Sequence, residues 1–168
     1  MKLFHTGPAT VDLHENYAKR GLLDENAPVR STSTIEIDAP VSTVWQLVSD
    51  MRGWTNWRTD ARVTEIEHLQ VDAPFRWTLN GMPIKAVFAT IEPEREIAWT
   101  GVALGCMRAV DRMWFEALEG GRTRVAMEES LAGPLLSLFF TSDKLRAGHD
   151  RMLQQLKNAA EAVVVAGV

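Results

Sequence analysis

Short runs of alternating apolar and polar residues occupy the middle of the chain, from Arg62 to Leu131. Every second residue of a strand faces the same side, so this alternation predicts half-buried strands. Turn signals divide the region at Asp72-Ala73-Pro74, Asn80-Gly81, Glu92-Pro93-Glu94, Leu104-Gly105 and Glu119-Gly120-Gly121. The runs between them predict an antiparallel meander of six strands: Val63–Leu69, Phe75–Leu79, Ile84–Ile91, Glu96–Ala103, Arg108–Leu118 and Thr123–Leu131. Ile35 and Ile37 alternate in the same way and predict an earlier, seventh strand.

Helical spacing appears on both sides of this meander. Pro40 is suited to a first helical turn, and an apolar stripe at helical spacing follows it: Val41, Val44, Trp45 and Val48. A second short helix is expected between Met51 and Trp57, after a break at Gly53. Gly133-Pro134 is expected to start a long C-terminal helix with one inward face, made of Leu138, Leu145, His149, Met152, Leu156 and Ala159. Near the N-terminus, spacing predicts a short helix over Val11–Arg20 that ends at Gly21.

Composition and charge bound the number of domains and argue against several kinds of partner and location. The 168 residues, 46% of them apolar, suffice for one domain, which we place at residues 30–165 after an N-terminal arm, residues 1–29. The net charge of −4 is scattered, without the basic stripe or polybasic run that nucleic acid or an anionic membrane attracts. Cys106 is the one cysteine, so no disulfide forms within the chain, and a cytoplasmic location is expected. Met1–Thr10 lacks a signal peptide's apolar stretch, and the apolar tail, residues 162–168, is too short to span a membrane.

Several separated fragments accompany this order of strand, two short helices, six strands and a long helix. They are Ile37-Asp38-Ala39-Pro40 with Val44-Trp45, Gly53-Trp54-Thr55-Asn56-Trp57, Phe75-Arg76-Trp77, Ile91-Glu92-Pro93, Ile97-Ala98-Trp99, Gly120-Gly121-Arg122-Thr123-Arg124-Val125, and Glu129 ahead of Gly133-Pro134. In their order and spacing the chain resembles the START-like superfamily, also called helix-grip or SRPBCC, and within it the polyketide cyclase/dehydrase-like group. The resemblance implies an α+β fold in which a curved seven-stranded antiparallel sheet wraps around the C-terminal helix and leaves a cavity.

Alternation indicates which side chains line that interior. In the strand Ile84–Ile91 both faces are apolar, so Ala86 with Phe88 and Val87 with Ile91 compete for the inside. Large aromatic residues usually just fill a core, and that is the plainer interpretation of each one here. The functional interpretation is that part of the set walls a pocket for a small molecule. The expected lining residues are Trp57, Trp77, Phe88, Trp99, Met113, Phe115, Met127, Leu145 and Met152.

Three polar residues fall on the same predicted interior: Asp111, Glu129 and His149. Burial raises the pKa of a carboxyl group toward the range useful for acid or base catalysis, and an imidazole can hydrogen-bond a ligand or move a proton. Alternatively, the carboxylates pair with nearby arginines, and His149 is a buried histidine that bonds to a neighbour. In many relatives a histidine stands where this chain has Asp111, facing an acid like Glu129. The chain departs from that pattern, which puts a transferred catalytic pair in doubt.

No other chemistry is indicated. His5, His14 and His68 show no ligand spacing, and there is no HExxH or CxxC motif, glycine-rich phosphate loop or GxSxG turn. We therefore expect no metal and no cofactor. The leading function is binding or carriage of a small hydrophobic or amphipathic molecule, a lipid, polyketide-like or aromatic compound. The alternative is a polyketide cyclase- or dehydratase-like enzyme that uses Asp111, Glu129 or His149. A third is a regulator, whose arm caps the cavity mouth or packs on a second subunit of a homodimer.

Overall fold

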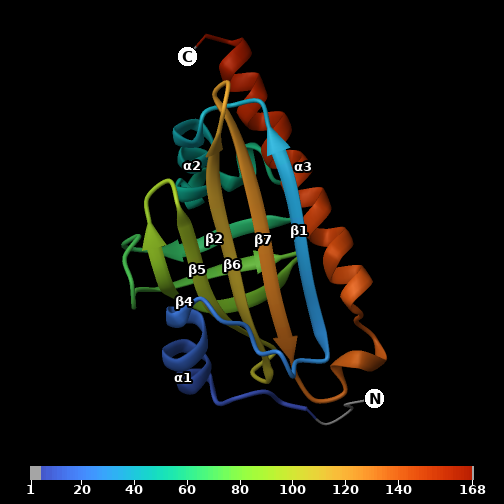
Figure 1. Cartoon of the computed structure of the whole chain (residues 1–168). Coiled ribbons are helices and arrows are strands. Elements are labelled where there is room, and N and C mark those ends of the chain that lie inside the picture. The colour runs from blue at the N-terminus through green and yellow to red at the C-terminus, as the bar shows by residue number, and fades with distance from the viewer. Residues whose placement is uncertain (1–4, 168) are drawn as a thin grey trace.

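A curved antiparallel sheet and one long helix dominate the structure, a computed structural model that describes residues 5–167 (Figure 1). The sheet has seven strands in the order β1-β7-β6-β5-β4-β3-β2. From β2 to β7, strands that follow one another in the chain lie side by side and pair. The first strand, β1, pairs with β7 at one edge of the sheet, and β2 forms the other edge. The long helix α3 runs along the sheet, and the short helices that follow β1 lie near its C-terminal end. This is the α+β helix-grip architecture expected from the order of elements.

The strands are β1 (Val29–Ile37), β2 (Ala61–Ile66), β3 (Pro74–Leu79), β4 (Met82–Glu92), β5 (Glu96–Ala103), β6 (Met107–Leu118) and β7 (Arg122–Ala132). The helical segments are α1 (Thr10–Asp12), η1 (Leu13–Tyr17), η2 (Ala18–Arg20), α2 (Val41–Ser49), η3 (Met51–Asn56), η4 (Leu136–Leu138) and α3 (Ser142–Val165). All seven predicted strands are confirmed. The type of the β3–β4 turn also follows from sequence, because Asn80 and Gly81 both have the positive φ, 49° and 80°, that a tight hairpin needs.

The predicted start of the long helix was wrong. Gly133-Pro134 does not open it; Leu135 takes a left-handed conformation, with φ of 59°, and only the short turn η4 follows. Thr141 is the true N-cap, since its side chain accepts a hydrogen bond from the Lys144 backbone N–H. Leu138 therefore lies outside α3 and is 60% exposed, not on the inward face of the helix.

The main core fills the space between the sheet and helices α2, η3 and α3. A β-bulge between Phe88 and Thr90 resolves the ambiguity in β4. Phe88 pairs with Trp99, and beyond the bulge Ile91 pairs with Ile97, so Phe88 and Ile91 both face the core. Ala89 instead faces outward. The first set therefore contributed both Ala86 and Phe88 to the core, and the second set contributed Ile91.

The N-terminal arm packs on the outer face of the sheet, opposite the core. Leu13 and Ala18 form a buried cluster with Ala89 of β4 and Val110 of β6. Gly21, with φ of 67°, ends this helical run as predicted. The arm lies against its own sheet, so it does not cap the interior. Expectations for residues 1–4, part of the segment judged for a signal peptide, fall outside the described residues.

Candidate functional site

The fold brings together the three polar residues that alternation selected. Asp111 of β6 and Glu129 of β7 are direct partners across the two strands. His149 reaches them from α3, and its Nε2 lies 2.9 Å from Oε2 of Glu129. Asp111 and His149 are both almost completely buried, at 5% and 4% exposure. The result is a polar cluster inside an otherwise apolar interior.

Arg58 is the fourth member of this cluster, and sequence reasoning missed it. It is buried, its Nε donates to Oδ1 of Asp60 at 2.9 Å, and its guanidinium lies 5.0 Å from the Trp54 ring centroid. It also lies 5.8 Å from the centroid of Trp77. The charge of Arg58 acts on both Asp111 and His149. No local pattern marks it, because its burial depends on rings contributed by η3 and β3.

Burial controls the protonation of the cluster. The pKa of Asp111 is raised from 3.8 to about 8, mainly by loss of solvent and secondly by the negative charge of Glu129, while the charges of His149 and Arg58 oppose the rise. For His149, burial lowers the pKa, but the hydrogen bond and charge of Glu129, with the charge of Asp111, outweigh it and raise the pKa overall. Because the pKa values of Asp111 and His149 are both raised, at neutral pH a protonated Asp111 lies beside a His149–Glu129 ion pair.

Several polar atoms of the interior have no hydrogen-bond partner among the residues the structure describes. They include Oδ1 of Asp111, Nδ1 of His149 and Nε1 of Trp77. A buried polar atom without a partner costs free energy, so such atoms are unusual in a folded protein. Asp111 and His149 thus have hydrogen-bonding capacity that the fold does not use.

Most of the predicted lining residues pack against one another in the main core. Phe75 and Phe88 stack with ring centroids 4.3 Å apart, and Trp77 meets Trp99 edge-on at 6.3 Å. The predicted residues found in this core are Trp77, Phe88, Trp99, Met113, Phe115, Met127 and Met152. Leu145 lies elsewhere, in a second buried cluster with Val29, Ala103, Met107 and Leu136.

Trp57, the remaining predicted lining residue, is partly buried against the main core and contributes to a groove at its edge. The groove has a volume of about 490 Å³ and is formed by α2, η3 and the C-terminal part of α3, with Thr43, Gln46, Leu47, Ser49, Asp50, Gly53, Asn56, Trp57 and Val163 as its lining. Nε1 of Trp57 is buried and has no partner within residues 5–167. Trp57 and Arg58 are consecutive, so one short segment connects the groove to the polar cluster.

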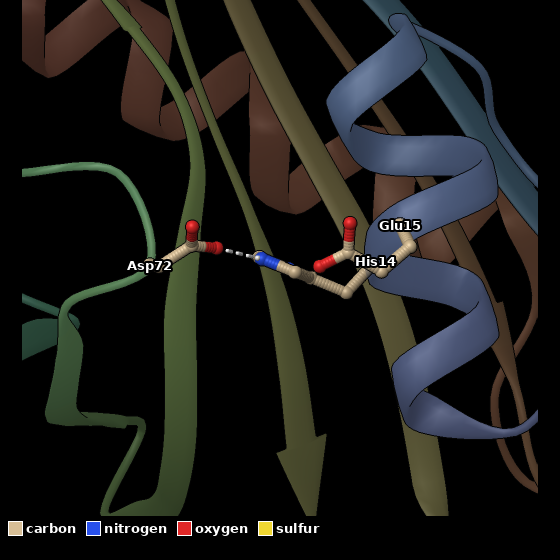
Figure 2. A group of neighbouring side chains, drawn as sticks. All are labelled: His14, Glu15 and Asp72. Atoms are coloured by element: carbon tan, nitrogen blue, oxygen red, sulfur yellow. Dashed lines mark hydrogen bonds and ion pairs between the residues drawn. The ribbon is translucent and has the colours of Figure 1, made fainter.

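A second polar group lies on the outer face, where the arm meets the β2–β3 connection (Figure 2). His14, Glu15 and Asp72 place potential metal-ligand atoms within 4.8 Å of one another, a proximity that their sequence spacing did not reveal. His14 bonds to Oγ1 of Thr100 through Nδ1 and to Oδ1 of Asp72 through Nε2, both at 2.9 Å. The ammonium group of Lys19 bridges Asp72 and Glu15 at 2.8 and 2.9 Å. These contacts explain the group as an anchor for the arm.

Fold and cluster together define a helix-grip protein with a buried acid, an acid–histidine pair and a buried arginine. The chain belongs to the family described as polyketide cyclase / dehydrase and lipid transport, whose model matches residues 28–161. This confirms the predicted superfamily and group. A ligand-binding or cyclase-like role is the activity consistent with that family.

Solved structures share the fold at low sequence identity. A hypothetical protein of Helicobacter pylori is 16% identical, with a TM-score of 0.71 over 82% of this chain and 90% of that one. A protein of Arthrobacter aurescens is 17% identical, with a TM-score of 0.67 over 83% and 91%. DynU16, from the dynemicin biosynthetic locus, is 18% identical, with a TM-score of 0.64 over 79% of this chain and 47% of that one. No curated protein matches the chain.

Across residues 5–167, no helix is long and apolar enough to cross a membrane.

Proposed function

We propose that the protein binds a small amphipathic molecule, with the polar group of the ligand at Asp111 and His149 and its apolar body among the core side chains. The observation that carries this proposal is the unused hydrogen-bonding capacity of Asp111 and His149 inside an apolar interior. A protonated carboxyl and the free N–H of an imidazolium are both donors. The ligand group that satisfies them is an acceptor, a carbonyl or carboxylate oxygen.

Room for the ligand would come from the methionines that surround the cluster. Met113, Met127 and Met152 are buried in the main core, and unbranched thioether side chains repack around irregular apolar molecules more easily than branched ones. The ligand would enter from the groove at Trp57, and the segment that carries Trp57 and Arg58 would have to shift to let it reach the cluster. Each Å² of ligand surface buried there contributes about 25 cal/mol before the costs of binding.

The binding proposal is tested by titration with two compounds that differ in one group. 2-Acetylnaphthalene has a carbonyl, whereas 2-ethylnaphthalene has the same apolar body without it. Quenching of tryptophan fluorescence should show tighter binding of the ketone by about tenfold, the value of one good hydrogen bond to a buried group. Asp111→Ala and His149→Ala should remove this preference, while the exposed control Glu119→Gln should keep it.

Equal affinity for the two compounds, or an unchanged preference in both alanine variants, would refute the assignment. Native mass spectrometry of protein purified from its own cells, followed by organic extraction, would identify a resident ligand. A recovered compound that Asp111→Ala, Glu129→Ala and His149→Ala all bind like the wild type would also count against this site.

The second candidate is a dehydratase- or cyclase-like enzyme, and the specific observation that favours it is the pKa of Asp111, raised to about 8. A group that titrates near neutral pH suits proton transfer. In a dehydration, a base removes a proton next to a carbonyl while an acid protonates the departing hydroxyl, so the products are an enone and water. Conversion of 4-hydroxy-4-phenylbutan-2-one to its enone, followed by absorbance, tests this. Loss of turnover in Asp111→Asn with ketone binding retained would favour catalysis over carriage.

Three further expectations belong to this proposal. The arm, residues 1–29, is distinct from the ligand-binding domain, residues 30–165; the protein works in the cytoplasm; and it forms a homodimer. The oligomeric state is measured by light scattering coupled to gel filtration. The third alternative, a regulator that uses its arm to contact a partner, has less support, because residues of the arm are packed on the sheet of their own chain.

A further inference from the structure

The β5–β6 turn and the connection between β7 and α3 lie at the same end of the molecule (Figure 1). Four large apolar residues of these two segments are exposed. The four residues are Leu104, Leu135, Leu138 and Phe139, which we call the apolar tip. Their exposures are 65%, 43%, 60% and 57%. Residues next to the tip are packed together beneath it: Ala103, Leu136 and Leu145 belong to one buried cluster with Val29 and Met107.

The backbone at the tip is in a conformation that leucine disfavours. Leu104 and Leu135 have φ of 52° and 59°, the left-handed region where a bulky side chain is strained. The other non-glycine residues with positive φ among residues 5–167 are polar: Asp72, Asn80 and Glu94. Leu104-Gly105 adopts the same pair of left-handed conformations as Asn80-Gly81 in the β3–β4 hairpin, where asparagine fits the turn. Neither strain nor exposure of these leucines helps the free protein fold.

Basic side chains border the tip although the chain as a whole is acidic. Arg30 follows Val29 of the buried cluster, and Lys144 and Arg146 flank Leu145. All three are exposed, and Asp143 is the acidic residue in this first part of α3. The Arg30 backbone N–H donates to Oγ of Ser142 at 3.1 Å, which joins the start of β1 to the start of α3. Residues separated by more than 100 positions thus form a local positive border that the sequence did not reveal.

We propose that the apolar tip docks on the surface of an anionic lipid bilayer. A few protruding leucines and a phenylalanine with a basic border match the boundary between acyl chains and negatively charged headgroups. Such contact buries the four apolar side chains and gives the two strained leucines a role that the fold does not. The proposal concerns the outer end of the molecule and does not depend on the interior ligand site.

Sedimentation with vesicles tests the docking. The protein should bind vesicles of phosphatidylcholine and phosphatidylglycerol in a ratio of about 7:3 more strongly than pure phosphatidylcholine, and added salt should weaken the binding. Leu138→Ser should lower the partition coefficient about fivefold or more, since it removes an inserting side chain. The matched control is Leu22→Ser, which alters a leucine of similar exposure, 52%, on the arm. Arg30→Gln with Arg146→Gln should remove the preference for anionic vesicles, whereas Arg95→Gln should not.

Leu104→Asn separates this role from any structural one. Asparagine relieves the strained turn, so this variant should unfold at higher urea concentration than the wild type and yet bind vesicles more weakly. No sedimentation of the wild type with anionic vesicles would overturn the proposal. Equal losses in Leu138→Ser and Leu22→Ser would do the same. A concentration-dependent dimer that Leu138→Ser dissociates, without vesicle binding, would assign the tip to a second copy of the chain and also refute it.

Discussion

Replacement of Asp111 by asparagine is the most direct test of the buried cluster. Asparagine has nearly the same shape but no charge, so Asp111→Asn removes the titration and keeps the packing. In the folded protein the pKa of Asp111 rises from 3.8 to about 8, mainly because the carboxyl is buried and secondly because Glu129 is close. In the unfolded chain the same group ionises near its ordinary value.

The sign of the effect follows from proton binding. Between about pH 4 and pH 8 the folded state keeps a proton on Asp111 that the unfolded state has lost, so stability falls as pH rises through this range. The slope approaches about 1.4 kcal/mol per pH unit, and the full cost above pH 8 is at most about 6 kcal/mol. The raised pKa of His149 acts in the same direction, because its stabilising charge is lost as pH rises through its folded value.

Urea unfolding at about pH 5, 7 and 9 measures these slopes. Wild type should lose several kcal/mol between the first and last pH, whereas Asp111→Asn should lose much less and be the more stable protein at pH 9. A residual slope from His149 is expected in the variant. Glu119→Gln, in the exposed β6–β7 turn, should retain the wild-type slope. Wild-type stability that rises with pH, or an unchanged slope in Asp111→Asn, would refute this account of the cluster.

Two other substitutions probe the contacts around the sheet. His149→Leu leaves the half-buried Glu129 without its partner and should lower the unfolding free energy by about 3 kcal/mol at pH 7 in the same urea assay. The double variant, Glu129→Gln with His149→Leu, should recover part of this loss because it also removes the unpaired charge. His14→Leu removes the two hydrogen bonds that His14 makes to Thr100 and Asp72, so hydrogen exchange should accelerate in residues 10–20 while the strands stay protected. Equal acceleration in β6 would contradict a local anchor.

The sequence predicted the fold well where turn residues and hydrophobic periodicity indicate the same element boundaries. The predicted strand Glu96–Ala103 matches β5 residue for residue, since turns bound it on both sides. The start of α3 failed because Gly133-Pro134 resembles a helix opening, while the decisive signal was the N-cap Thr141. The bulge in β4 was also invisible, because it depends on how this strand pairs with β5 and not on its own residues.

The candidate site was predictable only in part. Strand alternation and the adjacency of the two strands placed Asp111 and Glu129 on one face, and helical spacing pointed His149 at the sheet, so the three residues were expected in one interior. Arg58 lacks such a pattern, since its burial comes from Trp54 and Trp77 on other elements. The interior was expected to be hollow, yet alternation cannot distinguish a cavity wall from a packed core.

Asp111 is the residue whose presence the fold explains least. Glu129 already bonds to His149, and Arg58 bonds to Asp60, so each charged neighbour has a partner of its own. At pH 7 the buried carboxyl therefore lowers stability, and an apolar or amide side chain of similar size would fold at least as well. A residue that costs stability and has an unpartnered oxygen in the interior is the best reason to look for a bound molecule there. Nδ1 of His149 shares that lack of a partner, which adds a second unsatisfied polar atom to the same interior.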